Sequence, residues 1–416
     1  MRPVVAAVCV LAGCNEPAQP PEPAAASKVP AATPAPSKHV DGPVHAHREE
    51  PVIECPAARA EGGDDDAKVA ALVEAANKQL AIAAYAAAWT CADRAADLAP
   101  TSVEAHHLRG AALAALGRDQ EAQVAYSLAL ALDPDDPETL RAVADFYING
   151  TTKAELGRDA LRLGLELAQR GSRRVIARRR RTPQLGADLA VLEAQALNDL
   201  GRSDEALARI EVALRLAPGR GDALHEKGVA LFDLSRFAEA KTVLVRALAI
   251  QPDDAYSHQM MGLTLEQLGD TPSADHELAR ALELAPAELA PPVLISPAEF
   301  RTEVDAVIAR LPVDRRARVR SIKVEVVDLP DPADLAAVKP PFPPTILGLY
   351  RGPVGRAPQL AHDDIELPSI VLYRKNLARA VKTRAELSEQ IRDTLLHEVG
   401  HLEGLDEDDL RRRGME

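Results

Sequence analysis

Small and hydrophobic residues recur at regular intervals through the middle of the chain. Five stretches end on an apolar residue, one further residue and a proline, and successive prolines lie 34 residues apart except for one wider gap. Proline stops a helix because it lacks an amide hydrogen. The pattern therefore predicts an array of similar helical hairpins, closed by Pro100, Pro134, Pro218, Pro252 and Pro286.

Small residues occupy the same two positions in most of these units, which lets the two helices of a hairpin approach closely. One position holds Gly110, Ala194, Gly228 and Gly262, and the other holds Ala122, Ala206, Ala240 and Ala274. Gly117, Gly201 and Gly269 fall at the turn between helices, where glycine adopts a positive φ at little cost. With its 34-residue period, the stretch 67–290 resembles the tetratricopeptide repeat family. The resemblance implies an α-solenoid whose concave face binds proteins or extended peptides, or one that only positions the next domain.

The repeat is interrupted between Pro134 and Pro218, which lie 84 residues apart. We expect one degenerate or enlarged unit in this interval. It carries arginines at 173, 174 and 178–181. We interpret them as a solvated helix face, and a basic patch for an acidic partner or for lipid head groups is the alternative.

After Pro291 and Pro292 the period ends and the pattern changes to mixed helix and strand. Residues 296–299 read Ser-Pro-Ala-Glu, a capping box that predicts a helix to about Leu311. Short strands are expected at 322–329, 346–350 and 370–374. The proline-rich segment 339–344 is expected to be a loop.

A second capping box opens another helix at Thr383, with Glu386 three residues later. One face of this helix is an apolar stripe formed by Leu387, Ile391 and Leu395. His397 and His401 lie on a different face, four residues apart, so their imidazoles project side by side. The helix is thus expected to pack in a core and to present two metal ligands.

Residues 397–407 form the pattern H-E-x-x-H-x-x-G-x-x-E. Two imidazoles and a carboxylate leave a fourth position open on a tetrahedral Zn²⁺, as in catalytic zinc sites. The expected ligands are His397, His401 and Glu407, with Asp408 as the alternative third ligand. Gly404 is expected to end the helix and turn the chain back. Glu398 is the expected general base for hydrolysis of a peptide bond.

A tyrosine is a candidate donor to the oxyanion that forms during hydrolysis. Tyr350 and Tyr373 both fall in expected strands before the metal motif. We favour the simpler interpretation that they are packed strand residues.

From about Leu294 to the end, the chain resembles the minimal bacterial zincin-like metallopeptidases, sometimes called minigluzincins. The matching pieces are the opening helix at 296–300, the segments 346–350, 370–374 and 395–401, Gly404, and the acidic run 406–409. The resemblance implies a compact α/β domain in which zinc is held by two histidines and an acidic third ligand. The substrates of this family are poorly defined.

The first fourteen residues have the form of a lipoprotein signal. Arg2 precedes an apolar run that ends in Leu11-Ala12-Gly13-Cys14, which resembles the bacterial lipobox, where the cysteine becomes the lipidated first residue. A buried apolar N-terminus is the alternative. Asn15 after the cysteine, by resemblance to the sorting rules of diderm bacteria, favours anchoring at the outer membrane, facing the periplasm.

Residues 14–66 are rich in proline and alanine and are expected to form an extended linker without a core. Cys55 and Cys91 remain as an even pair outside the leader. They could form a disulfide in an oxidising compartment, and two unpaired thiols are the alternative.

The formal net charge of −14 argues against nucleic acid as a partner, and the 3% aromatic content favours closely packed helices. We predict a mainly α protein with a signal peptide (1–13), a linker (14–66), a repeat domain (67–290) and an α/β zincin-like metallopeptidase domain (291–416). The expected function is that of a membrane-anchored zinc peptidase whose repeats recruit a peptide or protein substrate or a partner. The alternative is an interaction lipoprotein with a zinc-binding but inactive peptidase domain.

Overall fold

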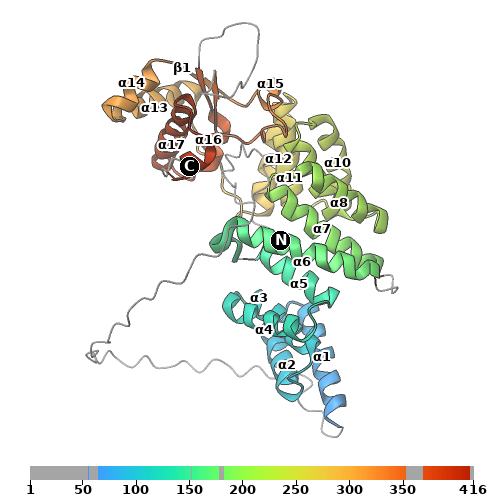
Figure 1. Ribbon diagram of the computed structural model, residues 1–416. Coiled ribbons are helices and arrows are strands. Elements are labelled where there is room, and N and C mark those ends of the chain that lie inside the picture. The colour runs from blue at the N-terminus through green and yellow to red at the C-terminus, as the bar shows by residue number, and fades with distance from the viewer. Residues whose placement is uncertain (1–54, 56–63, 151, 178–181, 353–368, 413–416) are drawn as a thin grey trace, which may run out of the picture.

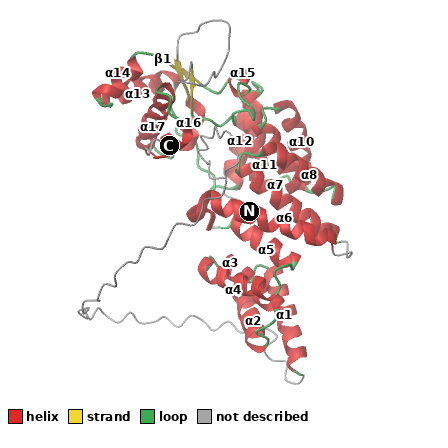
Figure 2. Ribbon diagram, viewed as in Figure 1, coloured by secondary structure: helices red, strands yellow, loops and turns green. Residues whose placement is uncertain are grey.

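The computed structural model describes residues 55, 64–150, 152–177, 182–352 and 369–412 (Figure 1). Helices dominate this part of the chain, and its strands lie close to the C-terminus (Figure 2). No described helix is both long and apolar enough to cross a lipid bilayer. The signal sequence with Cys14 and most of the linker lie outside the described residues.

The repeats form a row of antiparallel helix pairs, from α1 and α2 to α11 and α12. The first helices are α1 (Asp65–Ala81), α3 (Val103–Ala115), α5 (Pro137–Asn149), α7 (Pro183–Asp199), α9 (Gly221–Asp233) and α11 (Ala255–Gln267). The second helices are α2 (Tyr85–Leu98), α4 (Asp119–Leu132), α6 (Thr152–Ala177), α8 (Ser203–Leu216), α10 (Phe237–Ile250) and α12 (Thr271–Leu284). Each first helix also packs on the first helix of the next pair, so these helices form the inner layer of a superhelix. The predicted solenoid of tetratricopeptide repeats is confirmed.

The turns within the hairpins show why the small residues recur. Gly117, Gly201 and Gly269 have φ values of 72°, 76° and 78°. Ala83 and Ser235 take the equivalent place in two other hairpins, and each has a φ of 58°, where an L side chain is strained. A Cβ atom on Gly228 would lie 2.5 Å from Leu244, so the predicted close approach of paired helices is also confirmed.

The interrupted region forms one hairpin with a long second helix. α6 runs over 26 residues, and its backbone leaves helical values at Gly157. Arg174 pairs with Asp135, which precedes α5, at 2.6 Å, and Arg173 is exposed. Residues 178–181 lie outside the described part. The enlarged unit is therefore present, and Arg174 serves the packing of its own hairpin.

The chain after the repeats folds around a three-stranded sheet of order β1-β3-β2. The strands are β1 (Lys323–Val327), β2 (Gly348–Arg351) and β3 (Ser369–Tyr373). The helices are α13 (Pro297–Arg310), α14 (Val313–Arg320), α15 (Pro332–Leu335), α16 (Arg374–Ala380), α17 (Arg384–Leu402) and α18 (Glu407–Arg412). β1 runs parallel to β3 and β2 antiparallel to it. The three predicted strands and the small α/β fold are confirmed.

The central strand β3 buries its two faces against different parts of the molecule. Ile370 and Leu372 join the core that α13 and α17 form with the sheet. Val371 and Tyr373 join an apolar cluster that extends into α9, α10 and α11 of the last repeats. The sheet and the last repeats therefore share one hydrophobic core.

An ion-pair cluster lies between the last repeat and the C-terminal helices. The carboxylate of Glu266, on α11, accepts from Lys375 at 2.8 Å and from Arg379 at 2.6 Å, both on α16. The Glu266 side chain is 2% exposed. A carboxylate buried to this degree is stable only beside opposite charges. The cluster therefore fixes α16, the helix just before α17, against the repeats.

A disulfide joins Cys55 and Cys91, whose Cα atoms lie 4.9 Å apart. Cys91 lies on α2, and both cysteines are buried. The bond ties the end of the predicted linker to the first hairpin.

Candidate metal centre

The helix α17 carries the metal motif and begins at the predicted cap. The Thr383 hydroxyl accepts from the Glu386 amide at 3.2 Å, and the Glu386 carboxylate accepts from the amide of Lys382 rather than that of Thr383. One face of the helix is fully buried through Leu387, Ile391, Leu395 and Val399. This packing fixes the rotation of α17 about its axis and hence the direction of its other faces.

The two histidines of α17 bring their Nε2 atoms together. His397 Nε2 and His401 Nε2 lie 3.1 Å apart. Two nitrogen ligands about 2.05 Å from a tetrahedral Zn²⁺ are separated by about 3.3 Å. The pair therefore fits two neighbouring positions on one zinc ion with little adjustment. His397 is 2% exposed and His401 is partly exposed, so the pair lies at the edge of the domain interior.

The end of α17 fixes the ring of His401. Gly404 has a φ of 83° and its amide donates to His401 O, while the Leu405 amide donates to Gly400 O, a Schellman motif. The same turn places Leu405 O 3.2 Å from His401 Nδ1. Because a carbonyl only accepts, this contact holds the proton on Nδ1 and leaves the Nε2 lone pair for a metal.

The helix α18 returns toward the motif and packs on Gly400. A Cβ atom on Gly400 would collide with Leu410, which is fully buried. Glu407 and Asp408 lie on α18, but their side chains fall outside the described part of the structure. Among the described side chains, no group of three His, Cys, Asp or Glu residues is placed to hold a metal ion. The third ligand therefore stays a prediction.

Glu398 lies beside the edge strand β2. The residue is 5% exposed, and a Cβ atom on Gly348 of β2 would lie 3.4 Å from Glu398 Oε1 and 2.6 Å from Thr394 Cγ2. The absence of a side chain at Gly348 thus lets α17 and β2 approach closely. This contact places the carboxylate of the expected general base next to a strand at the edge of the described sheet.

The two candidate tyrosines are buried strand residues. Tyr373 is fully buried, and its hydroxyl donates to Asp334 Oδ2 at 3.3 Å. Burial, with the negative charge of Asp334 next, raises the pKa of Tyr373 well above its usual range. Tyr350 is 6% exposed within the core of the sheet and α17, and burial raises its pKa as well. The packed-strand interpretation describes both residues.

Sequence reasoning missed two supports of the motif. The contact between the Leu405 carbonyl and the His401 ring was not predicted. Gly404 could have indicated it, because a turn at this glycine brings the carbonyl of the next residue back toward His401. Arg315 of α14 binds Glu403, the C-cap residue of α17, at 2.8 Å. The arginine-rich segment 313–320 lacks an apolar period, so neither the helix nor this contact was apparent.

Models of two protein families match the chain. The model of the zincin-like metallopeptidases matches residues 319–415, and models of the tetratricopeptide repeat match residues 103–136 and 197–264. The first match contains the whole metal motif and all three strands.

Solved structures resemble the repeats. Pseudomonas aeruginosa pilF is 15% identical, covers 54% of this chain and 95% of its own, and gives a TM-score of 0.45. PilW, described as a widely conserved type IV pilus biogenesis factor, is 15% identical, with coverage of 53% and 94% and a TM-score of 0.45. YrrB, described as a TPR protein with an unusual peptide-binding site, is 16% identical, with coverage of 47% and 93% and a TM-score of 0.35. Similarity at this level carries no information on activity or partners.

A search of curated proteins found no match to this chain. The family models and the fold agree on which domains the chain contains. It contains tetratricopeptide repeats between residues 103 and 264, followed by a zincin-like metallopeptidase domain at residues 319–415.

Proposed function

We propose that the C-terminal domain is a zinc-dependent peptidase and that the repeats bring it a substrate or partner. The observation that carries this proposal is the pair of Nε2 atoms of His397 and His401, 3.1 Å apart, on the helix that also bears Glu398. The match to the zincin-like metallopeptidase model supports the same conclusion.

The residues of the chain have distinct roles in this proposal. His397 and His401 hold the ion, with Glu407 as the third ligand and Asp408 as its alternative. Bound zinc supplies Lewis acidity, which activates a water molecule and polarises a peptide carbonyl. Glu398 accepts the proton of the attacking water and delivers it to the leaving amine.

The substrate is expected to lie along β2. This strand is at the edge of the described sheet, and the Glu398 carboxylate approaches it at Gly348. An extended peptide can pair with such a strand through main-chain hydrogen bonds, which would hold a scissile bond in a fixed orientation.

We further propose that Cys14 is lipidated and that residues 15–66 tether the protein to the outer membrane, facing the periplasm. The Cys55–Cys91 disulfide supports an oxidising compartment outside the cytoplasm. Expression of the Cys14→Ser variant tests the anchor. The variant should move from the membrane fraction to the soluble fraction, and an unchanged distribution would refute it.

Chelation and metal replacement test the zinc proposal. The full chain should hold one zinc ion, lose hydrolysis of an unbiased peptide library after chelation, and regain it with added zinc. Glu407→Gln and Asp408→Asn are matched variants, since each removes one charge from α18. The variant that loses zinc identifies the third ligand, and retention of zinc by both would exclude the two candidates.

The interaction-protein alternative draws on the repeats, whose inner helices form one continuous layer. It expects zinc binding without hydrolysis, together with a partner held by residues 67–290. Activity that requires both zinc and Glu398 would exclude it.

A further inference from the structure

Acidic residues line the inner layer of the repeats. Positions 7 and 11 residues apart in a helix lie within about 20° of each other around its axis. Three first helices each carry two carboxylates at such spacings, Glu138 and Asp145 on α5, Asp188 and Asp199 on α7, and Asp222 and Asp233 on α9. Glu104 takes the equivalent place on α3. We call these seven residues the acidic stripe.

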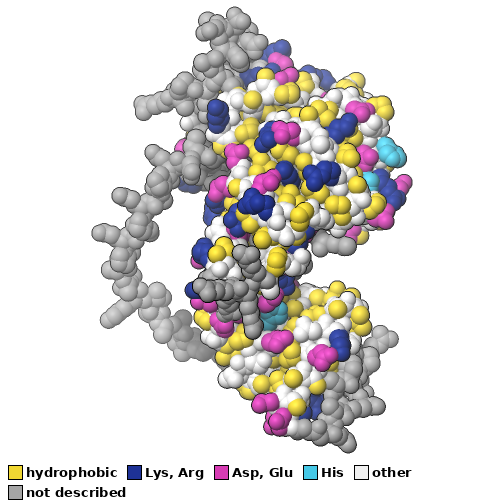
Figure 3. Space-filling view, turned by 90° about the vertical axis from the view of Figure 1, so that its right-hand side faces the viewer, with side chains coloured by type: hydrophobic (Ala, Val, Ile, Leu, Met, Phe, Trp, Pro, Cys, Tyr) yellow, Lys and Arg dark blue, Asp and Glu magenta, His cyan; other side chains and the backbone are white. Residues whose placement is uncertain are grey.

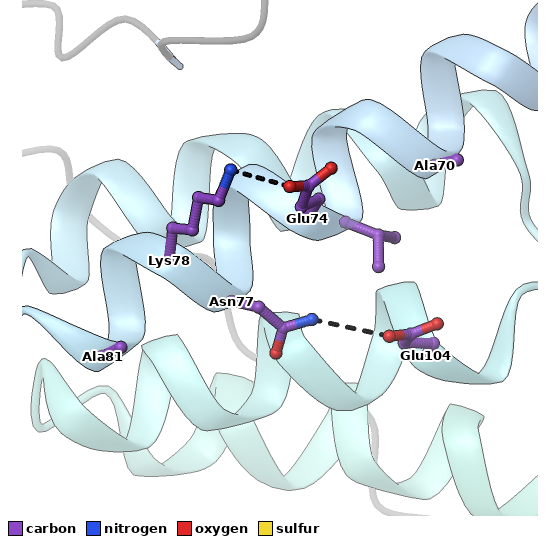
Figure 4. A pocket seen from close by; sticks show the side chains of 7 residues that line it. Ala70, Glu74, Asn77, Lys78, Ala81 and Glu104 are labelled. Carbon is purple, nitrogen blue, oxygen red and sulfur yellow. Dashed lines mark hydrogen bonds and ion pairs between the residues drawn. The ribbon is translucent and has the colours of Figure 1, made fainter.

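One member of the stripe, Glu104, lines a groove. In the first hairpins, an open pocket is lined by the inner face of α1, from Ala70 to Ala81, and by Glu104 of α3. Figure 4 shows Asn77 reaching from α1 toward Glu104, with which it forms a 3.5 Å hydrogen bond. Because the first helices pack on one another from α1 to α11, the equivalent faces of α5, α7 and α9 continue this surface.

The arginines that pair with the stripe do not neutralise it. Arg220 binds both Asp188 and Asp222, and its side chain is 16% exposed, against 29% and 42% for its partners. Arg141 is 3.9 Å from Glu138, whose side chain is 60% exposed. The arginines thus lie deeper than the carboxylates they pair with, which leaves negative charge toward solvent.

The carboxylates also act on one another. Burial raises the pKa of Glu138, and the charges of Asp136 and Asp188 contribute to the same direction. Burial raises the pKa of Asp233 to about 7, and Asp199 and Glu226 again contribute. Mutual repulsion on two separate helices indicates a negative potential along the surface rather than at one point.

At the C-terminal end of the same layer, a carboxylate binds two basic side chains. Glu266 lies on the first helix α11 of the last repeat, and it binds Lys375 and Arg379 of α16. A lysine and an arginine of the peptidase domain are therefore docked by a carboxylate of an inner helix. The stripe on α3, α5 and α7 presents the same chemistry two to four repeats away. Over the face in Figure 3, acidic and basic side chains are interspersed.

We propose that the acidic stripe docks an extended, lysine- and arginine-bearing segment of a protein substrate or partner. The proposal rests on the recruiting role of the repeats and does not require catalysis. The segment would run along α3, α5 and α7 while the peptidase domain covers the C-terminal end of the layer. Charge pairing at several exposed carboxylates gives fast, salt-dependent association.

Fluorescence anisotropy with a labelled peptide of alternating lysine and serine tests the proposal. The full chain carrying Glu398→Gln is used so that the peptide stays intact. The chain should bind this peptide, with affinity that falls as salt increases, and should not bind the same peptide with glutamate in place of lysine. Equal binding of both peptides would overturn the proposal.

Charge reversal locates the binding surface. Glu104→Lys combined with Glu138→Lys should weaken binding at least about tenfold. Asp97→Lys combined with Glu166→Lys is the matched control, because these exposed residues lie on the second helices α2 and α6 and change the net charge equally. The control should bind like the parent, and an equal loss in both variants would overturn the proposal.

Two further measurements separate this inference from the peptidase proposal. The milder Glu104→Gln with Glu138→Gln variant should also weaken binding, which guards against misfolding of the charge-reversed form. Hydrolysis of a short uncharged peptide by the same variants with Glu398 intact should be unchanged. Binding of the lysine peptide without any hydrolysis would support docking at the acidic stripe and contradict the peptidase proposal. Hydrolysis without binding of this peptide would support the peptidase proposal and contradict docking.

Discussion

Leu410 of α18 packs into the space that a side chain on Gly400 would occupy. The contact brings the helix with the predicted third zinc ligand back against the helix with the two histidines. An alanine at position 400 would push Leu410 outward and move α18.

Gly400→Ala should therefore weaken zinc binding, by about tenfold, while the helix itself gains propensity. Competition with a chromophoric chelator measures the affinity. Adding Leu410→Ala removes the collision and should restore part of the affinity, although it opens a small cavity. Wild-type affinity in the single variant would show that α18 does not support the site.

Ser235 offers a stabilising substitution. It has a φ of 58°, where L residues are strained, and its hydroxyl is buried without a hydrogen-bond partner among the described atoms. Ser235→Gly should raise the free energy of unfolding by about 1 kcal/mol. Gly269→Ser, at the equivalent turn with a φ of 78°, should lower it by a similar amount. Urea unfolding measures both, and changes of the same sign would contradict the explanation.

The raised pKa of Asp233 leads us to predict that the stability of the fold depends on pH. Its folded-state pKa of about 7 lies above the ordinary value, so the folded protein binds this proton more tightly than the unfolded chain. The contribution of the group to stability is present at low pH, falls as pH rises from about 4, and is lost above about 7.

Asp233→Asn removes this titration. The Ser203 hydroxyl, 3.1 Å from Asp233 Oδ2, can donate to an asparagine oxygen as well. Relative to wild type, the variant should gain on the order of 2 kcal/mol in unfolding free energy between pH 5 and pH 8. A constant difference between the two proteins across this range would refute the assignment.

The ion pairs of Glu266 are predicted to hold the peptidase domain against the repeats. Glu266→Ala leaves Lys375 and Arg379 facing a buried surface without their carboxylate, and should cost about 3 kcal/mol. Limited proteolysis should then cut between α12 and α13 sooner than in wild type. The control Glu277→Ala removes a carboxylate from α12 that binds His258 within the repeats, and should not expose this connection.

Local signals determined which parts of the C-terminal domain could be predicted. Ser296 and Glu299 form both hydrogen bonds of the expected capping box. The metal motif places its two histidines on one helix by spacing alone. By contrast, the shared core depends on Leu335 and Ile346, which lie next to a proline-rich segment and meet the repeats only in the folded chain.

Contacts between residues that are far apart in the chain were the main feature that could not be predicted from the sequence. Glu266 and Arg379 are 113 residues apart in sequence, and neither has a neighbour that signals the other. The acidic stripe was readable as a spacing, since its members repeat with the helical hairpins. The packing of the repeats shows that those positions lie on one inner layer.

The most direct test of the central claim is hydrolysis by the zinc-loaded chain and by its Glu398→Gln variant at equal zinc content. Glutamine preserves the size of the side chain but cannot accept the proton of the attacking water. We predict that both proteins hold one zinc ion and that only the wild type hydrolyses a peptide library. Equal hydrolysis by the two would contradict the assignment of Glu398 and the proposed mechanism.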